Sequence, residues 1–160
     1  MKLLRGQLLK FMDKKLLKYA SHCVKLDLMK ARLEVFENES GSRGVDFIVK
    51  SKLGKYYEIS LQTLNLENAD RSIKIPQTDW NYELPDNLLI ALVLFMKKME
   101  PAVFLIPCKV FKEPDNRFFF NNQQDERFKY LSNWEIKIFT NGIKELSEKY
   151  AFLNTVNLLD

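Results

Sequence analysis

Two carboxylates, Asp46 and Glu58, lie on either side of a short turn and are the residues best suited to chemistry. Carboxylate oxygens are preferred Mg²⁺ ligands, and a bound metal stabilises the charge that develops in phosphoryl transfer. Ser60 and Gln62 follow Glu58 at every second position, so on an extended strand the three side chains share one face. The pattern indicates a small polar patch, although acidic residues on strand pairs commonly face solvent without a ligand.

The turn decides whether these side chains meet. The segment from Ser51 to Gly54 fits a three-residue hairpin loop in which Gly54 is left-handed. The pairs that result are Ser51 with Lys55, Ile48 with Glu58, and Asp46 with Ser60. Opposed Cβ atoms lie ~4.5–5.5 Å apart, so the polar side chains would converge. A two-residue turn would shift the pairing by one and separate Asp46 from Glu58.

The surrounding elements predict an α/β domain in which helices cover a mixed sheet. The first thirty residues repeat apolar side chains at three- and four-residue spacing, with Asp13 expected to cap a break between two helices. Residues 88–95 and 103–106 are apolar throughout, so we expect central strands there. The residues from 111 to 124 cannot be assigned to a helix or a strand from their pattern. Further strands are expected at 33–37, 45–49, 56–63, 73–76 and 134–139, and a final helix capped by Thr140 at 141–152.

Length and composition indicate the number of domains and the expected location of the protein. The 160 residues form a single expected domain, 1–160, with an N-terminal helical segment, and the formal charge of +4 permits a polyanionic partner without requiring one. The longest apolar run has nine residues, well below the ~20 that span a bilayer, so we expect no membrane association and a cytoplasmic location. Cys23 and Cys108 are expected as free thiols.

The hairpin resembles that of the PD-(D/E)XK nucleases. Its strands read Gly-Val-Asp-Phe-Ile-Val and Tyr-Tyr-Glu-Ile-Ser-Leu-Gln-Thr, similar to a bacterial branch whose second strand reads Tyr-Glu-Ile-Gln-Val-Lys. The resemblance continues through residues 79–81, 87–93, 102–107, 134–136 and 146–152. It implies a restriction-endonuclease-like mixed β-sheet flanked by helices. It also implies a hairpin Asp and an acidic residue or Gln that hold Mg²⁺, and a Lys that orients the attacking water.

Several positions depart from that pattern. Asp46 stands at the metal-binding Asp, but Ser60 replaces the acid or Gln and Gln62 replaces the Lys. Ser21 falls where the first helix of the family carries a further Glu. Serine brings no charge to a hard cation, and glutamine has no ammonium. Glu58 offers a second carboxylate, so Asp46 and Glu58 are the expected metal ligands if a metal binds.

Two functions remain open, and a third, weaker alternative is a degenerate relative from a mobile element or defence system with no remaining binding role. The first is a catalytically impaired or inactive nuclease-like module that binds DNA or a protein partner. The second is an active Mg²⁺-dependent DNA endonuclease with a variant metal site. The missing Lys and acid favour the first. Four basic residues near the hairpin could contact phosphates, or could discourage aggregation at an exposed edge. These residues are Arg43, Lys50, Lys52 and Lys55.

Overall fold

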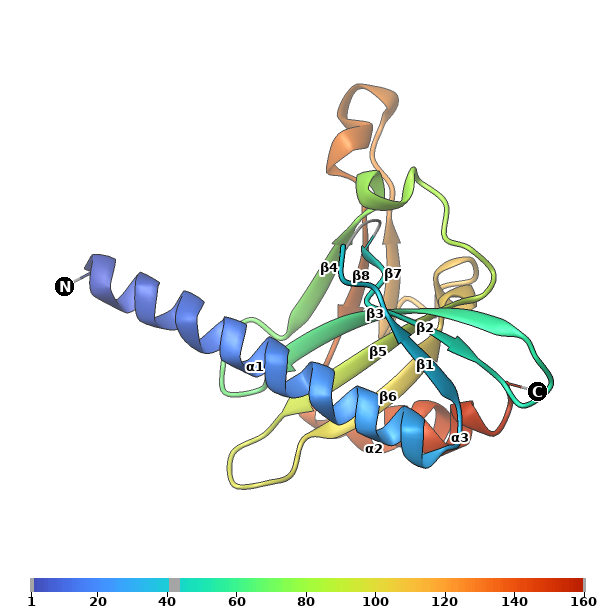
Figure 1. The fold of residues 1–160 in the computed structure, drawn as a ribbon. Helices are drawn as coiled ribbons and strands as arrows, with labels where there is room; N and C mark the ends of the chain where they lie inside the picture. The colour runs from blue at the N-terminus through green and yellow to red at the C-terminus, as the bar shows by residue number, and fades with distance from the viewer. Residues whose placement is uncertain (1, 41–43, 160) are drawn as a thin grey trace.

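The computed structural model describes residues 2–40 and 44–159, and side chains from residue 13 onward. Its elements follow the order given next, with η marking 3₁₀ turns (Figure 1). They are α1 (Lys2–Lys30), β1 (Glu34–Glu37), β2 (Phe47–Lys50), β3 (Tyr56–Asn65), β4 (Ser72–Pro76), η2 (Gln77–Trp80), β5 (Leu88–Phe95), β6 (Ala102–Pro107), η3 (Cys108–Phe111), β7 (Phe119–Asn122), η4 (Glu126–Leu131), β8 (Asn133–Lys137), η5 (Thr140–Gly142), α2 (Ile143–Tyr150) and α3 (Phe152–Val156).

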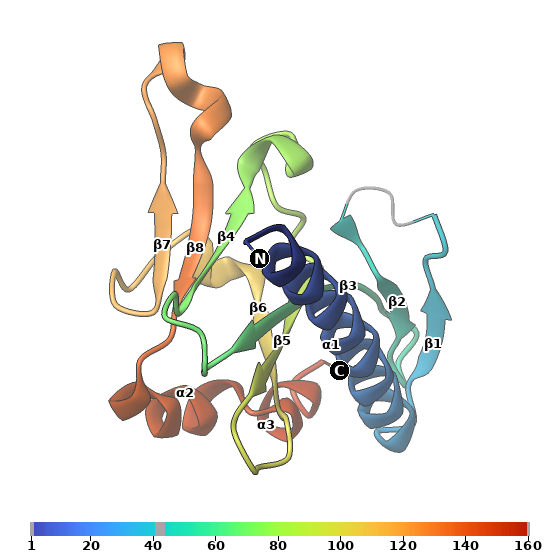
Figure 2. The same ribbon diagram turned by 90° about the vertical axis from the view of Figure 1, so that its left-hand side faces the viewer.

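The strands form two sheets. The larger has five strands in the order β1-β2-β3-β5-β6, with β3 and β5 parallel and the other neighbours antiparallel. The smaller is antiparallel, in the order β4-β8-β7. A mixed sheet flanked by helices confirms the expected α/β class. The last expected strand, β8, belongs to the second sheet, which rises away from the first (Figure 2).

β5, an interior strand of the five-stranded sheet, is buried on both faces and is apolar at every position. Alternation sends successive β5 side chains to opposite sides. One face packs against α1, and the other against the second sheet and α2. The first core contains Ala20, Val24, Leu28, Leu89, Ala91 and Val93. The second contains Leu88, Ile90, Leu92, Ile75, Ile136 and Leu146.

The predicted break at Asp13 is wrong, because α1 runs unbroken from Lys2 to Lys30. Most residues on both sides of Asp13 are strong helix formers, no Pro interrupts them, and the one Gly of the segment, Gly6, lies well before Asp13. The helix crosses the five-stranded sheet and extends beyond it at its N-terminal end (Figure 1). Within the part of the chain that the structure describes, no helix is long and apolar enough to cross a bilayer.

β6 is not the central strand that its apolar run predicted, because it lies at the edge of its sheet. It is buried by the C-terminal segment: Phe104 bridges to Ala151, and buried Thr155 donates a 2.6 Å hydrogen bond to the Leu105 carbonyl. The expected final helix divides into α2 and α3 at Ala151, whose extended ψ of 143° ends the helical path. Thr140 provides no side-chain cap for it.

Candidate functional site

The hairpin turn has the predicted geometry. Gly54 is left-handed, with φ of 85°, and its amide donates to the Ser51 carbonyl at 3.0 Å. The Ser51 amide donates to the Lys55 carbonyl at 2.7 Å, which closes the three-residue loop. The ladder then pairs Ile48 with Glu58, as expected. The alternative two-residue turn is therefore wrong.

Asp46 lies beside Ser60, although not as a regular strand pair. The β2–β3 ladder ends at Phe47, and the Asp46 amide donates to the Ile59 carbonyl at 2.8 Å. The Asp46 Oδ2 accepts a 2.7 Å hydrogen bond from the Leu61 amide. The carboxylate thus replaces the strand partner that β3 loses where β2 ends. Burial raises the pKa of the Asp46 carboxyl, and the bond from Leu61 offsets part of that rise.

The remaining predicted residues share the face of β3 that turns toward the second sheet. Glu58, Ser60 and Gln62 stand beside Leu88, Ile90 and Leu92 of β5 in the parallel register. Ser60 is 3% exposed, whereas Glu58 and Gln62 are half-buried. The position that needs a metal-binding acid in the resembled family is therefore occupied by a small, buried hydroxyl.

Glu58 opens into a cleft that sequence reasoning did not place at the site. The cleft has a volume of about 430 Å³. Its lining includes Glu58, Asp79, Trp80 and Glu83. Gly44 lies under the Trp80 indole, where an added Cβ would come within 3.1 Å of the ring. Three carboxylates and no Lys or Arg line the cleft, so its field opposes a phosphate backbone.

The donor set does not fit the Mg²⁺ site that the resemblance implies. Among the described residues, no three His, Cys, Asp or Glu side chains are arranged to hold a metal. Asp46 already commits one oxygen to a backbone amide, and Ser60 supplies no charge. Mg²⁺ favours charged oxygen ligands in near-ideal octahedral geometry.

The other predicted residues do not gather at Asp46. Lys52 and Lys55 lie at the turn, and Lys55 is five residues from Ser60, or about 17 Å along an extended strand. Lys50 lies over the Tyr56 ring, with 5.8 Å from its Nζ to the ring centroid. Arg43 lies outside the described residues. Ser21 is on α1, which packs on the opposite face of the sheet from Ser60.

Comparison with known proteins gives a structural similarity but no match in sequence. No family model matches the sequence, and the search of curated proteins finds no match. A Holliday junction resolvase from the archaeal hyperthermophile Archaeoglobus fulgidus superposes with a TM-score of 0.48 at 8% identity. The superposition covers 86% of this chain and 94% of the resolvase. Nothing about the site follows from a similarity of this size.

Proposed function

We propose that this chain is a non-cleaving relative of the PD-(D/E)XK nucleases that binds nucleic acid. The observation that carries the proposal is the identity of the residues on the hairpin. The turn and the strands that the resemblance implies are formed, whereas the buried Ser60 and the residue Gln62 occupy the positions at which the resemblance implies an acid and a Lys. Binding of phosphates requires neither the acid nor the Lys that the resemblance implies.

The chemistry of cleavage explains why these two replacements matter. Hydrolysis of a phosphodiester needs positive charge at the reacting phosphate and a positioned water. Gln62 can donate a hydrogen bond, but it adds no charge and cannot transfer a proton as an ammonium can. General acid–base help alone is typically worth ~10²–10⁴ in rate. The cleft beside Glu58 adds the negative charge of Asp79 and Glu83 next to the hairpin.

One observation favours the alternative of an active Mg²⁺-dependent endonuclease. Glu58 pairs with Ile48, two positions along the hairpin from Asp46, so regular alternation continued past the end of the ladder would give both carboxylates the same face. In that alternative Asp46 and Glu58 would hold the metal, and Gln62 would orient the attacking water. The engaged Oδ2 of Asp46 weighs against it.

A cleavage assay separates the two functions. Highly purified wild-type protein and Asp46→Ala are incubated with supercoiled plasmid and linear duplex in Mg²⁺ and in Mn²⁺. We expect no cleavage above background from either protein. Robust wild-type cleavage that disappears in Asp46→Ala would overturn the non-cleaving proposal, whereas cleavage that persists in the variant would identify a contaminant. Duplex titrations at low salt test the binding half, and no association there would favour a protein partner.

A further inference from the structure

The positive charge of the chain is concentrated on its first helix. Residues 2–30 contain eight of the 25 Lys and Arg residues but two of the 21 Asp and Glu residues, so this segment carries +6. The rest of the chain carries −2. The helix is therefore the source of the mild overall excess, and the remainder of the domain would repel a polyanion weakly.

Two lysines of α1 form a shared basic face. Lys14 and Lys18 are four residues apart, so they lie one turn from each other on the same side of the helix. Both are exposed, and neither takes part in an ion pair among the described residues. Lys15 adjoins them in sequence. By contrast, Lys25 is neutralised by Glu37, with 2.6 Å between Nζ and Oε1.

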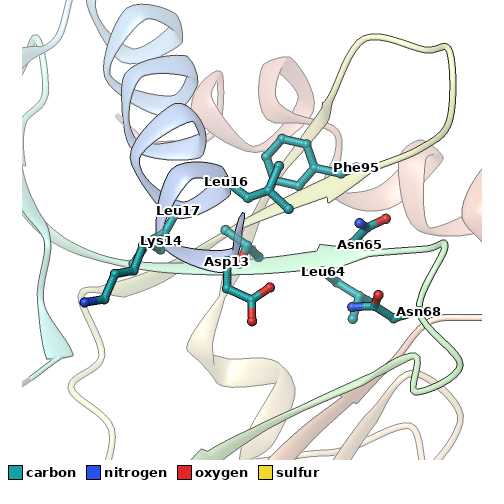
Figure 3. Close-up of a pocket in the computed structure, with 9 residues that line it drawn as sticks. Asp13, Lys14, Leu16, Leu17, Leu64, Asn65, Asn68 and Phe95 are labelled. Carbon is teal, nitrogen blue, oxygen red and sulfur yellow. The ribbon is translucent and has the colours of Figure 1, made fainter. Parts of the chain in front are cut away.

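The placement of this face leaves it open to solvent. Lys14 and Lys18 lie in the middle of α1, and both side chains are exposed. Below them is a cleft of about 400 Å³ at the ends of β3 and β5, lined in part by Asp13, Asn65 and Asn68. Lys14 also lines this cleft, and its ammonium end points away from Asn65 and Asn68 (Figure 3).

Like charges one helical turn apart cost the helix stability. An i,i+4 pair of lysines is destabilising by roughly 0.2–0.5 kcal/mol. Among the side chains that the structure describes, the fully buried residues of α1 are Ala20, Val24 and Leu28, all on the C-terminal side of the lysine pair. An anion that binds both ammonium groups would remove the repulsion. The acidic cleft at Glu58 supplies no competing site for such a ligand.

We infer that the face of α1 marked by Lys14 and Lys18, the α1 basic face, contacts the phosphate backbone of nucleic acid. The inference rests on the proposed function and names the surface that performs it. A phosphate backbone is favoured because it presents repeated negative charges to two exposed ammonium groups one helical turn apart, and such contacts need no base recognition. Binding by this face is independent of sequence.

The test uses charge reversal with a matched control. The α1 variant is Lys14→Glu with Lys18→Glu. The control is Lys109→Glu with Lys144→Glu, which makes the same change in net charge. Lys109 and Lys144 are exposed, lie on η3 and α2, and form no ion pair among the described residues. η3 and α2 pack on the opposite side of the five-stranded sheet from α1.

Affinity for a 30-bp duplex is measured as a function of salt, with circular dichroism melts to verify folding. Each phosphate contact contributes about tenfold to affinity at 50 mM salt, so the α1 variant should bind about 100-fold more weakly. The magnitude of its slope of log K against log salt should fall by about 1.8. The control should lose far less affinity and keep the wild-type slope.

Each contrary outcome has a distinct meaning. Equal losses in both variants, or an unaffected α1 variant, would overturn this inference and leave the proposed function standing. A wild-type chain that binds no duplex at 50 mM salt would overturn the nucleic-acid part of the proposed function and this inference with it. Tighter binding to phosphatidylserine vesicles than to duplex, lost in the α1 variant, would assign the face to a membrane surface instead.

Discussion

Asp46→Ala should destabilise the domain because the carboxylate completes the hydrogen bonding of β3. The Leu61 amide donates to Asp46 Oδ2 at 2.7 Å, at a point where β2 no longer pairs with β3. Truncation leaves that amide without its partner, at a cost of about 1–3 kcal/mol. In a domain of this size 1 kcal/mol corresponds to about 2–4 °C, so the melting temperature should fall by roughly 2–12 °C.

Asp46→Asn should have the opposite effect at neutral pH. Its amide oxygen can still accept the bond from Leu61. Burial raises the pKa of the Asp46 carboxyl above its ordinary value of 3.8. Between pH 3.8 and this raised pKa, the folded state binds the proton more readily than the unfolded state. Stability therefore falls as pH rises through that window, and the ionised group is a cost at pH 7. Asparagine removes that cost, and its advantage should vanish below pH 3.8.

Urea unfolding followed by tryptophan fluorescence at pH 7 and pH 3.5 measures both effects. Asp125→Ala is the control, since Asp125 is exposed and should change stability by no more than ~0.5 kcal/mol. Wild-type stability in Asp46→Ala would refute the capping role. An Asp46→Asn variant less stable than wild type at pH 7 would refute the burial argument, and would mean that the ionised carboxylate is stabilised by a partner.

Two further substitutions test the packing. Ala91→Asp should abolish the far-ultraviolet circular dichroism of the folded chain, because Ala91 is 0% exposed and an unpaired charge would be buried. A folded variant with the wild-type melting temperature would contradict the interior place of β5 in the sheet. Gly142→Ala should cost about 1–3 kcal/mol in urea unfolding, since its Cβ would lie 2.4 Å from the Phe139 ring and 2.7 Å from the Phe118 ring. An unchanged unfolding midpoint would mean that the two stacked rings move aside without cost.

The parts of the fold that the sequence predicts are those specified locally. Gly54 identifies the turn because only a left-handed residue closes that loop, and the register follows by counting. The apolar run of β5 identifies a strand buried on both faces. The same criterion fails for β6 because edge position depends on which strands pair, and burial by α3 produces the same apolar pattern.

The parts of the fold that the sequence does not predict depend on contacts between distant segments. β4 pairs with β8, across more than fifty residues, and each strand is only five residues long. That pairing helps to bring Asp79, Trp80 and Glu83 to Glu58, so no local signal could identify the cleft. Likewise, periodicity does not predict that the ladder ends at Phe47, or that the Asp46 carboxylate accepts the bond from the Leu61 amide there.

The arrangement of charge gives a physical reason why binding could outlast cleavage. The hairpin residues Glu58 and Ser60 face the second sheet, whereas α1 packs against the other face of the same sheet. Substitutions that removed an acid and an ammonium from the hairpin would leave Lys14 and Lys18 untouched, because the five-stranded sheet separates the two surfaces. Mutations at separated sites act additively, so the two properties can be lost independently. In this proposal the α1 basic face retains nucleic acid while the hairpin no longer cleaves it.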